Sequence, residues 1–104
     1  MPERVELLWW EGCPSSEEAH ELVRQLMAEA GIDPQSLRSI EIASDDAARR
    51  EGFPGSPTVR VDGRDVQPPE EDEPLGLTCR VYHLRDGRIS PLPDPEDIKE
   101  ALVR

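Results

Sequence analysis

A short apolar run near the start of the chain passes, after a four-residue break (Glu-Gly-Cys-Pro), into an amphipathic helix. Residues 5–10 (VELLWW) are too few for a helix and predict a buried strand. Ser15 then begins a capping-box pattern, Ser-Ser-Glu-Glu, and Gly31 supplies a stop signal. Between them, apolar residues recur at helical spacing: Ala19, Leu22, Val23, Leu26, Met27 and Ala30. A strand followed directly by a helix predicts an α/β fold.

The rest of the chain carries further strand and helix signals. Three more strands are expected at residues 37–43, 58–61 and 77–84, and residues 64–74 are expected to form an exposed, acidic, proline-rich loop. A short helix is expected after Ser44, through Arg50 or Glu51, and a last helix after the N-cap Asp94. The order β-α-β-α-β-β-α makes the first two strands parallel and the third and fourth antiparallel. We therefore predict a mixed four-stranded sheet flanked by helices.

The charge of the chain limits the partners that we expect. Among 104 residues, 23 acidic and 12 basic side chains give a formal net charge of −11. Nucleic acids and anionic membrane surfaces bind through Lys and Arg, so we expect neither as a partner. No apolar run approaches the roughly 20 residues of a membrane span. The start of the chain lacks the pattern of a secretion signal. We therefore expect a cytoplasmic protein whose thiols are reduced.

Cys13 lies where the first predicted strand ends and the first helix begins. A helix N-terminus presents unpaired N–H groups and a partial positive charge, which favour the reactive thiolate. Glu11, Glu17 and Glu18 act against this effect. Ser16 is expected to donate its hydroxyl to the Cys13 sulfur or to act only as a residue of the helix start. We interpret Cys13 as a candidate nucleophile; the alternative is a small buried cysteine at a turn.

Pro57 opens the third predicted strand, in the run Gly55-Ser56-Pro57-Thr58. A cis bond before proline costs only about 0.5–1 kcal/mol relative to trans, so this bond is a candidate for the cis form. An ordinary trans proline at the first residue of a strand is the alternative. In the cis interpretation, the bond faces the Cys13 thiol.

Two motifs in this order make the chain resemble the thioredoxin superfamily, and its compact glutaredoxin-like core in particular: Cys13-Pro14-Ser15-Ser16, and Ser56-Pro57-Thr58. A third run, Gly76-Leu77-Thr78-Cys79-Arg80-Val81-Tyr82, is similar to that of small, poorly characterised bacterial thioredoxin-like proteins. The resemblance implies one thioredoxin-like domain over residues 1–104, with Pro57 beside Cys13. It also implies that substrate binds at Ser56, Pro57 and Thr58, with the Ser56 backbone free to pair with an extended substrate.

The redox motif of that superfamily is Cys-x-x-Cys, and this chain departs from it. Ser16 occupies the last position of the motif, so no resolving cysteine is carried over to it. Cys79, the only other cysteine, has three interpretations. It is a core residue on a strand face shared with Leu77 and Val81, a displaced resolving cysteine, or a partner of Cys13 in binding a soft metal ion. No Cys/His cluster has zinc spacing, and we expect no cofactor.

Trp9 and Trp10 alternate across the first strand, so one is expected in the core and the other, on the opposite face, near Cys13. We take Trp10 as a candidate substrate contact. The leading hypothesis is a monothiol thiol–disulfide oxidoreductase, in which Cys13 attacks a protein or small-molecule disulfide and an external thiol or Cys79 resolves the intermediate. The alternatives are a non-catalytic peptide-binding module and a soft-metal or metalloid protein that uses Cys13 and Cys79.

Overall fold

The first strand lies inside a sheet and pairs with a different neighbour on each side. In the computed structural model, which describes residues 2–103, β1 (Val5–Trp9) runs parallel to β2 (Arg38–Glu41) and antiparallel to β3 (Thr58–Val61). β4 (Arg64–Asp65) pairs antiparallel with β3, and the sheet order is β2-β1-β3-β4. The predicted mixed four-stranded sheet, with its first two strands parallel, is confirmed.

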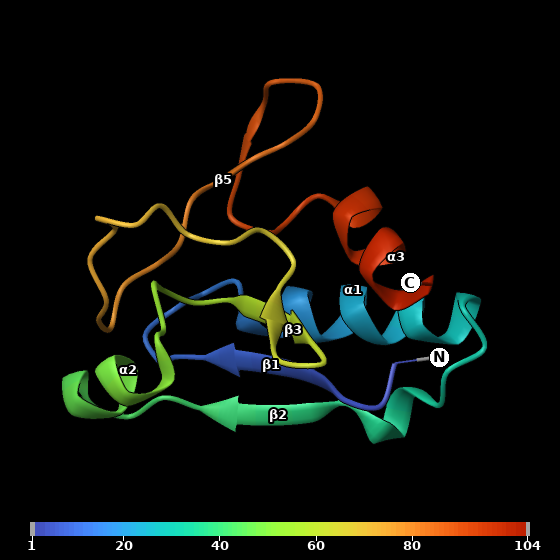
Figure 1. Cartoon of the computed structure of the whole chain (residues 1–104), viewed down its shortest axis with the longest axis horizontal. Coiled ribbons are helices and arrows are strands. Elements are labelled where there is room, and N and C mark those ends of the chain that lie inside the picture. The colour runs from blue at the N-terminus through green and yellow to red at the C-terminus, as the bar shows by residue number, and fades with distance from the viewer. Residues whose placement is uncertain (1, 104) are drawn as a thin grey trace.

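Helices and loops cover both faces of this sheet. Figure 1 shows α1 (Ser16–Glu29) and α3 (Pro95–Val103) together on one side, while α2 (Asp45–Glu51) lies beyond the ends of β1 and β2. A 3-10 turn (Pro34–Ser36) precedes β2. Leu7 packs in the cluster beneath α1 and α3, and Leu8 packs in a second cluster with residues of α2 and its flanking segments. Both leucines are fully buried, which explains why the first strand is apolar at every position except Glu6.

Three of the four predicted helix signals act as expected. The Ser44 hydroxyl accepts a hydrogen bond from the Ala47 N–H at 3.1 Å, and Asp94 accepts one from the Glu96 N–H at 2.9 Å. Gly31 follows α1 with a φ of +79°. The capping box predicted at Ser15 is wrong, because the side chain of Ser15 makes no capping hydrogen bond. The first turn of α1 is therefore fixed by packing and not by its cap.

The second half of the chain differs from the prediction. Within residues 64–74, expected to be a loop, Arg64–Asp65 forms the fourth strand, β4. The strand expected at residues 77–84 is absent from the four-stranded sheet. Instead, β5 (Tyr82–His83) pairs with β6 (Ile89–Ser90) in a separate hairpin, which stands away from the sheet in Figure 1. In residues 2–103, no helix is both long and apolar enough to cross a membrane.

Candidate functional site

Cys13 turns its sulfur toward the segment that leads into β3. Its backbone N–H donates to the Trp10 carbonyl at 3.0 Å, which closes a turn between β1 and α1. Its thiol lies 3.4 Å from the carbonyl oxygen of Ser56, to which it donates. The Ser56 hydroxyl in turn accepts a hydrogen bond from the Trp10 N–H at 3.1 Å. Cys13 is only 4% exposed, although Gly12 and Pro14 on either side are exposed.

Ser56 pairs with a second segment of the chain, residues 78–80. Its N–H donates to the Thr78 carbonyl at 2.8 Å, and its carbonyl accepts from the Arg80 N–H at 2.8 Å. These two bonds form a parallel β-bridge between Ser56 and Cys79. The resemblance implied that the Ser56 backbone is free for a substrate, but segment 78–80 already uses both groups.

This bridge brings the two cysteines together. Cys79 pairs with Ser56, whose carbonyl contacts the Cys13 thiol, so the two cysteines lie on adjacent segments. Partial desolvation, followed by the interaction with Cys13, raises the pKa of the Cys79 thiol. Cys79 is exposed whereas Cys13 is buried, so the expectation that Cys79 is a core residue is wrong. Both cysteines are free thiols.

Gly55 allows segment 78–80 to approach the start of β3 closely. Its φ is +144°, a backbone conformation that side-chain-bearing residues rarely adopt. A Cβ at this position would lie 3.2 Å from the Arg80 Cβ, the Arg80 nitrogen and the Thr78 Cγ2. A glycine here is therefore required by both the backbone conformation and the neighbouring segment.

Arg80 fixes the segment through a side chain that is 3% exposed. Its guanidinium donates to Asp65 at 2.8 Å, to the Tyr82 hydroxyl at 3.0 Å, and to the Gln67 carbonyl. It also lies over the Tyr82 ring, 4.6 Å from its centre. Burial raises the pKa of Asp65 even though Arg80 acts in the opposite direction. The ion pair thus joins segment 78–80 to β4.

The other residues that the sequence singled out differ in their accessibility. The Ser56–Pro57 bond is cis, as predicted. Ser56, Pro57 and Thr58 are all buried, and the Thr58 hydroxyl donates to the Gly55 carbonyl at 2.7 Å. Ser16 is the first residue of α1, and the hydrogen bonds of residues 2–103 include none from its hydroxyl to Cys13.

Trp10 lies in the turn that carries Cys13. It packs against the second hydrophobic cluster together with Leu77, and its ring occupies the space beside Gly12. A Cβ on Gly12 would lie 2.4 Å from two atoms of that ring. Trp10 is half-buried, and it supports the turn that carries Cys13.

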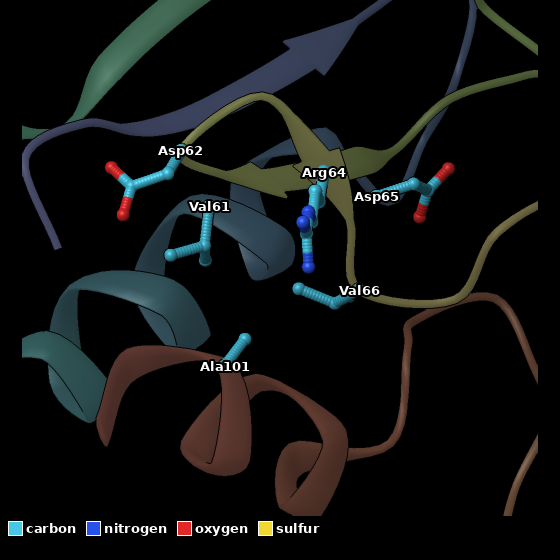
Figure 2. Close-up of a pocket in the computed structure, with 6 residues that line it drawn as sticks. All are labelled: Val61, Asp62, Arg64, Asp65, Val66 and Ala101. Atoms are coloured by element: carbon cyan, nitrogen blue, oxygen red, sulfur yellow. The ribbon is translucent and has the colours of Figure 1, made fainter. Parts of the chain in front are cut away.

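A hollow of about 320 Å³ lies elsewhere, between the β3–β4 turn and α3. Figure 2 shows Arg64 extending from β4 toward Ala101, while Asp62 and Asp65 point away to either side. Neither cysteine lines this hollow. The two thiols therefore lie outside this hollow.

Sequence reasoning missed Arg80, Asp65 and Tyr82, which hold Cys79 in place. It put the apolar residues Leu77 and Val81 on one strand face with Cys79, with the core as one interpretation of that face. In the structure Arg80 and Tyr82 are buried, and Val81 is 57% exposed. The sequence did contain one signal, an arginine (Arg80) and an aspartate (Asp65) that each lie in or next to a segment of β-forming residues. A buried arginine requires a buried acidic partner, so these two residues could have been paired.

Comparisons with protein-family models, with curated protein sequences and with solved structures found no match for this chain. Among residues 2–103, no group of three or more His, Cys, Asp or Glu side chains is arranged to hold a metal ion. The site is therefore interpreted from its own geometry.

Proposed function

We propose that the chain carries out thiol–disulfide exchange through the Cys13–Cys79 pair, on a thioredoxin-like scaffold. The observation that supports this most is the bridge between Cys79 and Ser56, whose carbonyl the Cys13 thiol contacts at 3.4 Å. Two free thiols on adjacent segments can form one disulfide and transfer two electrons to a substrate disulfide. Cys79 then supplies the second thiol of the pair, which Ser16 cannot provide.

The scaffold proposal is supported by the order and pairing of the elements. Cys13 lies between the central strand β1 and α1, and the segment before β3 lies against it. β1 has a parallel neighbour after α1 and an antiparallel one after α2. We propose further that the protein acts in a reducing compartment, such as the cytoplasm, where the pair is regenerated by an external dithiol.

The test is reversible formation of the Cys13–Cys79 disulfide. The folded protein is equilibrated in redox buffers, and peptide mapping by mass spectrometry locates the linked cysteines. We expect one intramolecular disulfide that is lost in Cys13→Ser and in Cys79→Ser and restored to two thiols by dithiothreitol. If both thiols are instead alkylated independently across the whole range of potentials, the proposed function is wrong.

The peptide-binding alternative requires free backbone groups on Ser56, and both groups are bonded to segment 78–80. The soft-metal alternative keeps one supporting observation, the placement of both cysteines next to Ser56. Titration with copper(I) tests it: a soft-metal protein binds one ion per chain, and either Cys→Ser substitution abolishes this binding. If copper(I) binds no more tightly to the wild type than to Cys79→Ser, this alternative is wrong.

A further inference from the structure

The two sulfurs of the pair differ in how a substrate can reach them. Cys13 is 4% exposed and its thiol is directed at the Ser56 carbonyl. Cys79 is exposed, on a segment at the surface of the chain. Attack on a disulfide requires the sulfur nucleophile to approach in line with the S–S bond, so access decides which sulfur reacts first.

The segment that carries Cys79 also prevents a substrate from reaching Cys13 along β3. Residues 78–80 form the two backbone hydrogen bonds to Ser56 that an added strand would need. Arg80 holds them there through its buried bonds to Asp65 and Tyr82. A substrate that replaced this segment would have to break these bonds and leave Asp65 buried without its partner, which is strongly unfavourable.

Building on the proposed function, we propose that Cys79 is the sulfur that first attacks the substrate, that Cys13 resolves the intermediate, and that the substrate is a disulfide without net negative charge. This reverses the roles that the position of Cys13 at a helix start predicted. Segment 78–80 of the chain itself pairs with the Ser56 backbone, where an extended substrate would otherwise pair.

The exchange proceeds in two balanced steps. Cys79 loses its proton to water, and its thiolate attacks one substrate sulfur. The S–S bond of the substrate breaks, and the first substrate thiolate leaves and takes up a proton. Cys13 then loses its proton and attacks the Cys79 sulfur, which forms the Cys13–Cys79 bond and releases the second substrate thiolate. The dithiol is oxidised by two electrons and the substrate is reduced to two thiols. An external dithiol reductant returns the pair to its starting state.

The charge of the chain gives the substrate preference. The formal net charge is −11, Glu17 and Glu18 lie exposed in the first turn of α1, and Glu11, two residues before Cys13, is also exposed. The only arginine of segment 78–80 is buried and paired with Asp65. A negatively charged disulfide is repelled on approach, whereas a neutral or positively charged one is not.

The first experiment identifies the attacking sulfur. Cys13→Ser and Cys79→Ser are each mixed with cystamine, a positively charged disulfide, and the adduct is followed by mass spectrometry. We expect Cys13→Ser to acquire half a cystamine on Cys79, and Cys79→Ser to react at least about tenfold more slowly, because Cys13 is buried. In concentrated urea the two variants should react at similar rates, which shows that folding causes the difference. Circular dichroism checks that both variants fold, and Cys13→Ala and Cys79→Ala replace any that does not.

The second experiment follows the wild type and varies the substrate. Acid quenching at early times should trap a mixed disulfide on Cys79 before the Cys13–Cys79 bond appears. Cystamine should react about tenfold faster than the dianionic 3,3′-dithiodipropionate at low salt, and the ratio should fall as salt is added.

Two results would overturn the inference and leave the proposed function standing: the early adduct lies on Cys13, or folded Cys79→Ser reacts as fast as folded Cys13→Ser. An anionic disulfide that reacts as fast as cystamine at low salt would overturn the substrate assignment. If adducts form on Cys79 but the Cys13–Cys79 disulfide never follows, the proposed function itself is wrong, so the two failures are distinguishable.

Discussion

The turn that carries Cys13 and the segment that carries Cys79 are held in place by different kinds of interaction. Cys13 lies between a strand and a helix, and its turn is closed by a local hydrogen bond to Trp10. Segment 78–80 has no regular element of its own and depends on partners that are distant in sequence. It bonds to Ser56 through the backbone and to Asp65 through the buried Arg80 side chain.

The difference shows how the fold brings together two thiols from distant parts of the sequence. The first group is placed by a pattern that spans neighbouring residues, and the second by one ion pair and two backbone hydrogen bonds. We therefore expect changes at the second region to affect the pairing of the thiols most, and changes at the first to be absorbed locally.

The largest effect is expected from Arg80→Met. This change removes the partner of the buried Asp65 carboxylate, and breaking a buried ion pair costs about 3–5 kcal/mol. Urea unfolding should show this loss, and the disulfide between Cys13 and Cys79 should form more slowly. The double variant Asp65→Leu/Arg80→Met should regain part of the stability, and Arg88→Met, in an exposed ion pair, should change little. A stable Arg80→Met protein with normal disulfide formation would contradict the role given to this ion pair.

A smaller effect is expected from Gly12→Ala in the first region. The added Cβ would lie 2.4 Å from the Trp10 ring, so the ring must leave its position against the second cluster. Overpacking of this kind costs about 1–3 kcal/mol, and the tryptophan fluorescence should change with it. Gly76→Ala is the matched control in the second region, because its Cβ would lie 3.5 Å from the nearest atom, an ordinary contact. Equal losses of stability in the two variants would show that the Trp10 contact does not matter.

A change in titration is expected when Cys13 is removed. Partial desolvation raises the pKa of Cys79, and the interaction with Cys13 raises it further. Cys13→Ala removes that interaction, so the alkylation of Cys79 should begin at lower pH than in the wild type. The measurement is the pH dependence of iodoacetamide labelling of the peptide that contains residue 79. A midpoint that stays in place or moves to higher pH would mean that the two thiols do not interact.

The smallest effect is expected from Ser15→Ala. The Ser15 side chain makes no capping hydrogen bond, whereas the Ser44 hydroxyl accepts one from the Ala47 N–H. Ser44→Ala should therefore lower the free energy of unfolding by about 1 kcal/mol, and Ser15→Ala by clearly less. Thermal unfolding of the two variants side by side makes the comparison. If Ser15→Ala is the more damaging of the two, the N-terminus of α1 is capped in solution in a way that the structure does not contain.

The sequence predicted the parts of the fold that depend on neighbouring residues. The apolar run of residues 5–10, the periodic stripe of α1, and the Asp94 cap each act over a few positions, so pattern and structure agree. In these cases the physical cause is local, and the neighbouring residues are sufficient. The cis form of the bond before Pro57 was favoured over trans only by its combination with Cys13, about forty residues earlier, and the structure has this bond cis.

The sequence did not predict where Cys79 lies, because its placement depends on partners far along the chain. The sequence put Leu77, Cys79 and Val81 on one strand face and left open whether that face lay in the core. In the structure Cys79 and Val81 are exposed and Arg80 is buried, since the pairing of Arg80 with Asp65 offsets the cost of burying a charge.

The carbonyl of Ser56 accepts hydrogen bonds from two donors, the Cys13 thiol and the Arg80 amide. Oxidation of Cys13 removes its thiol proton, so the Arg80 amide becomes the only one of these two donors and its hydrogen bond to the oxygen strengthens. The amide proton of residue 80 should then resonate further downfield in a nitrogen–proton correlation spectrum. A single peak, at a residue that takes no part in electron transfer, would report the redox state of the molecule in real time.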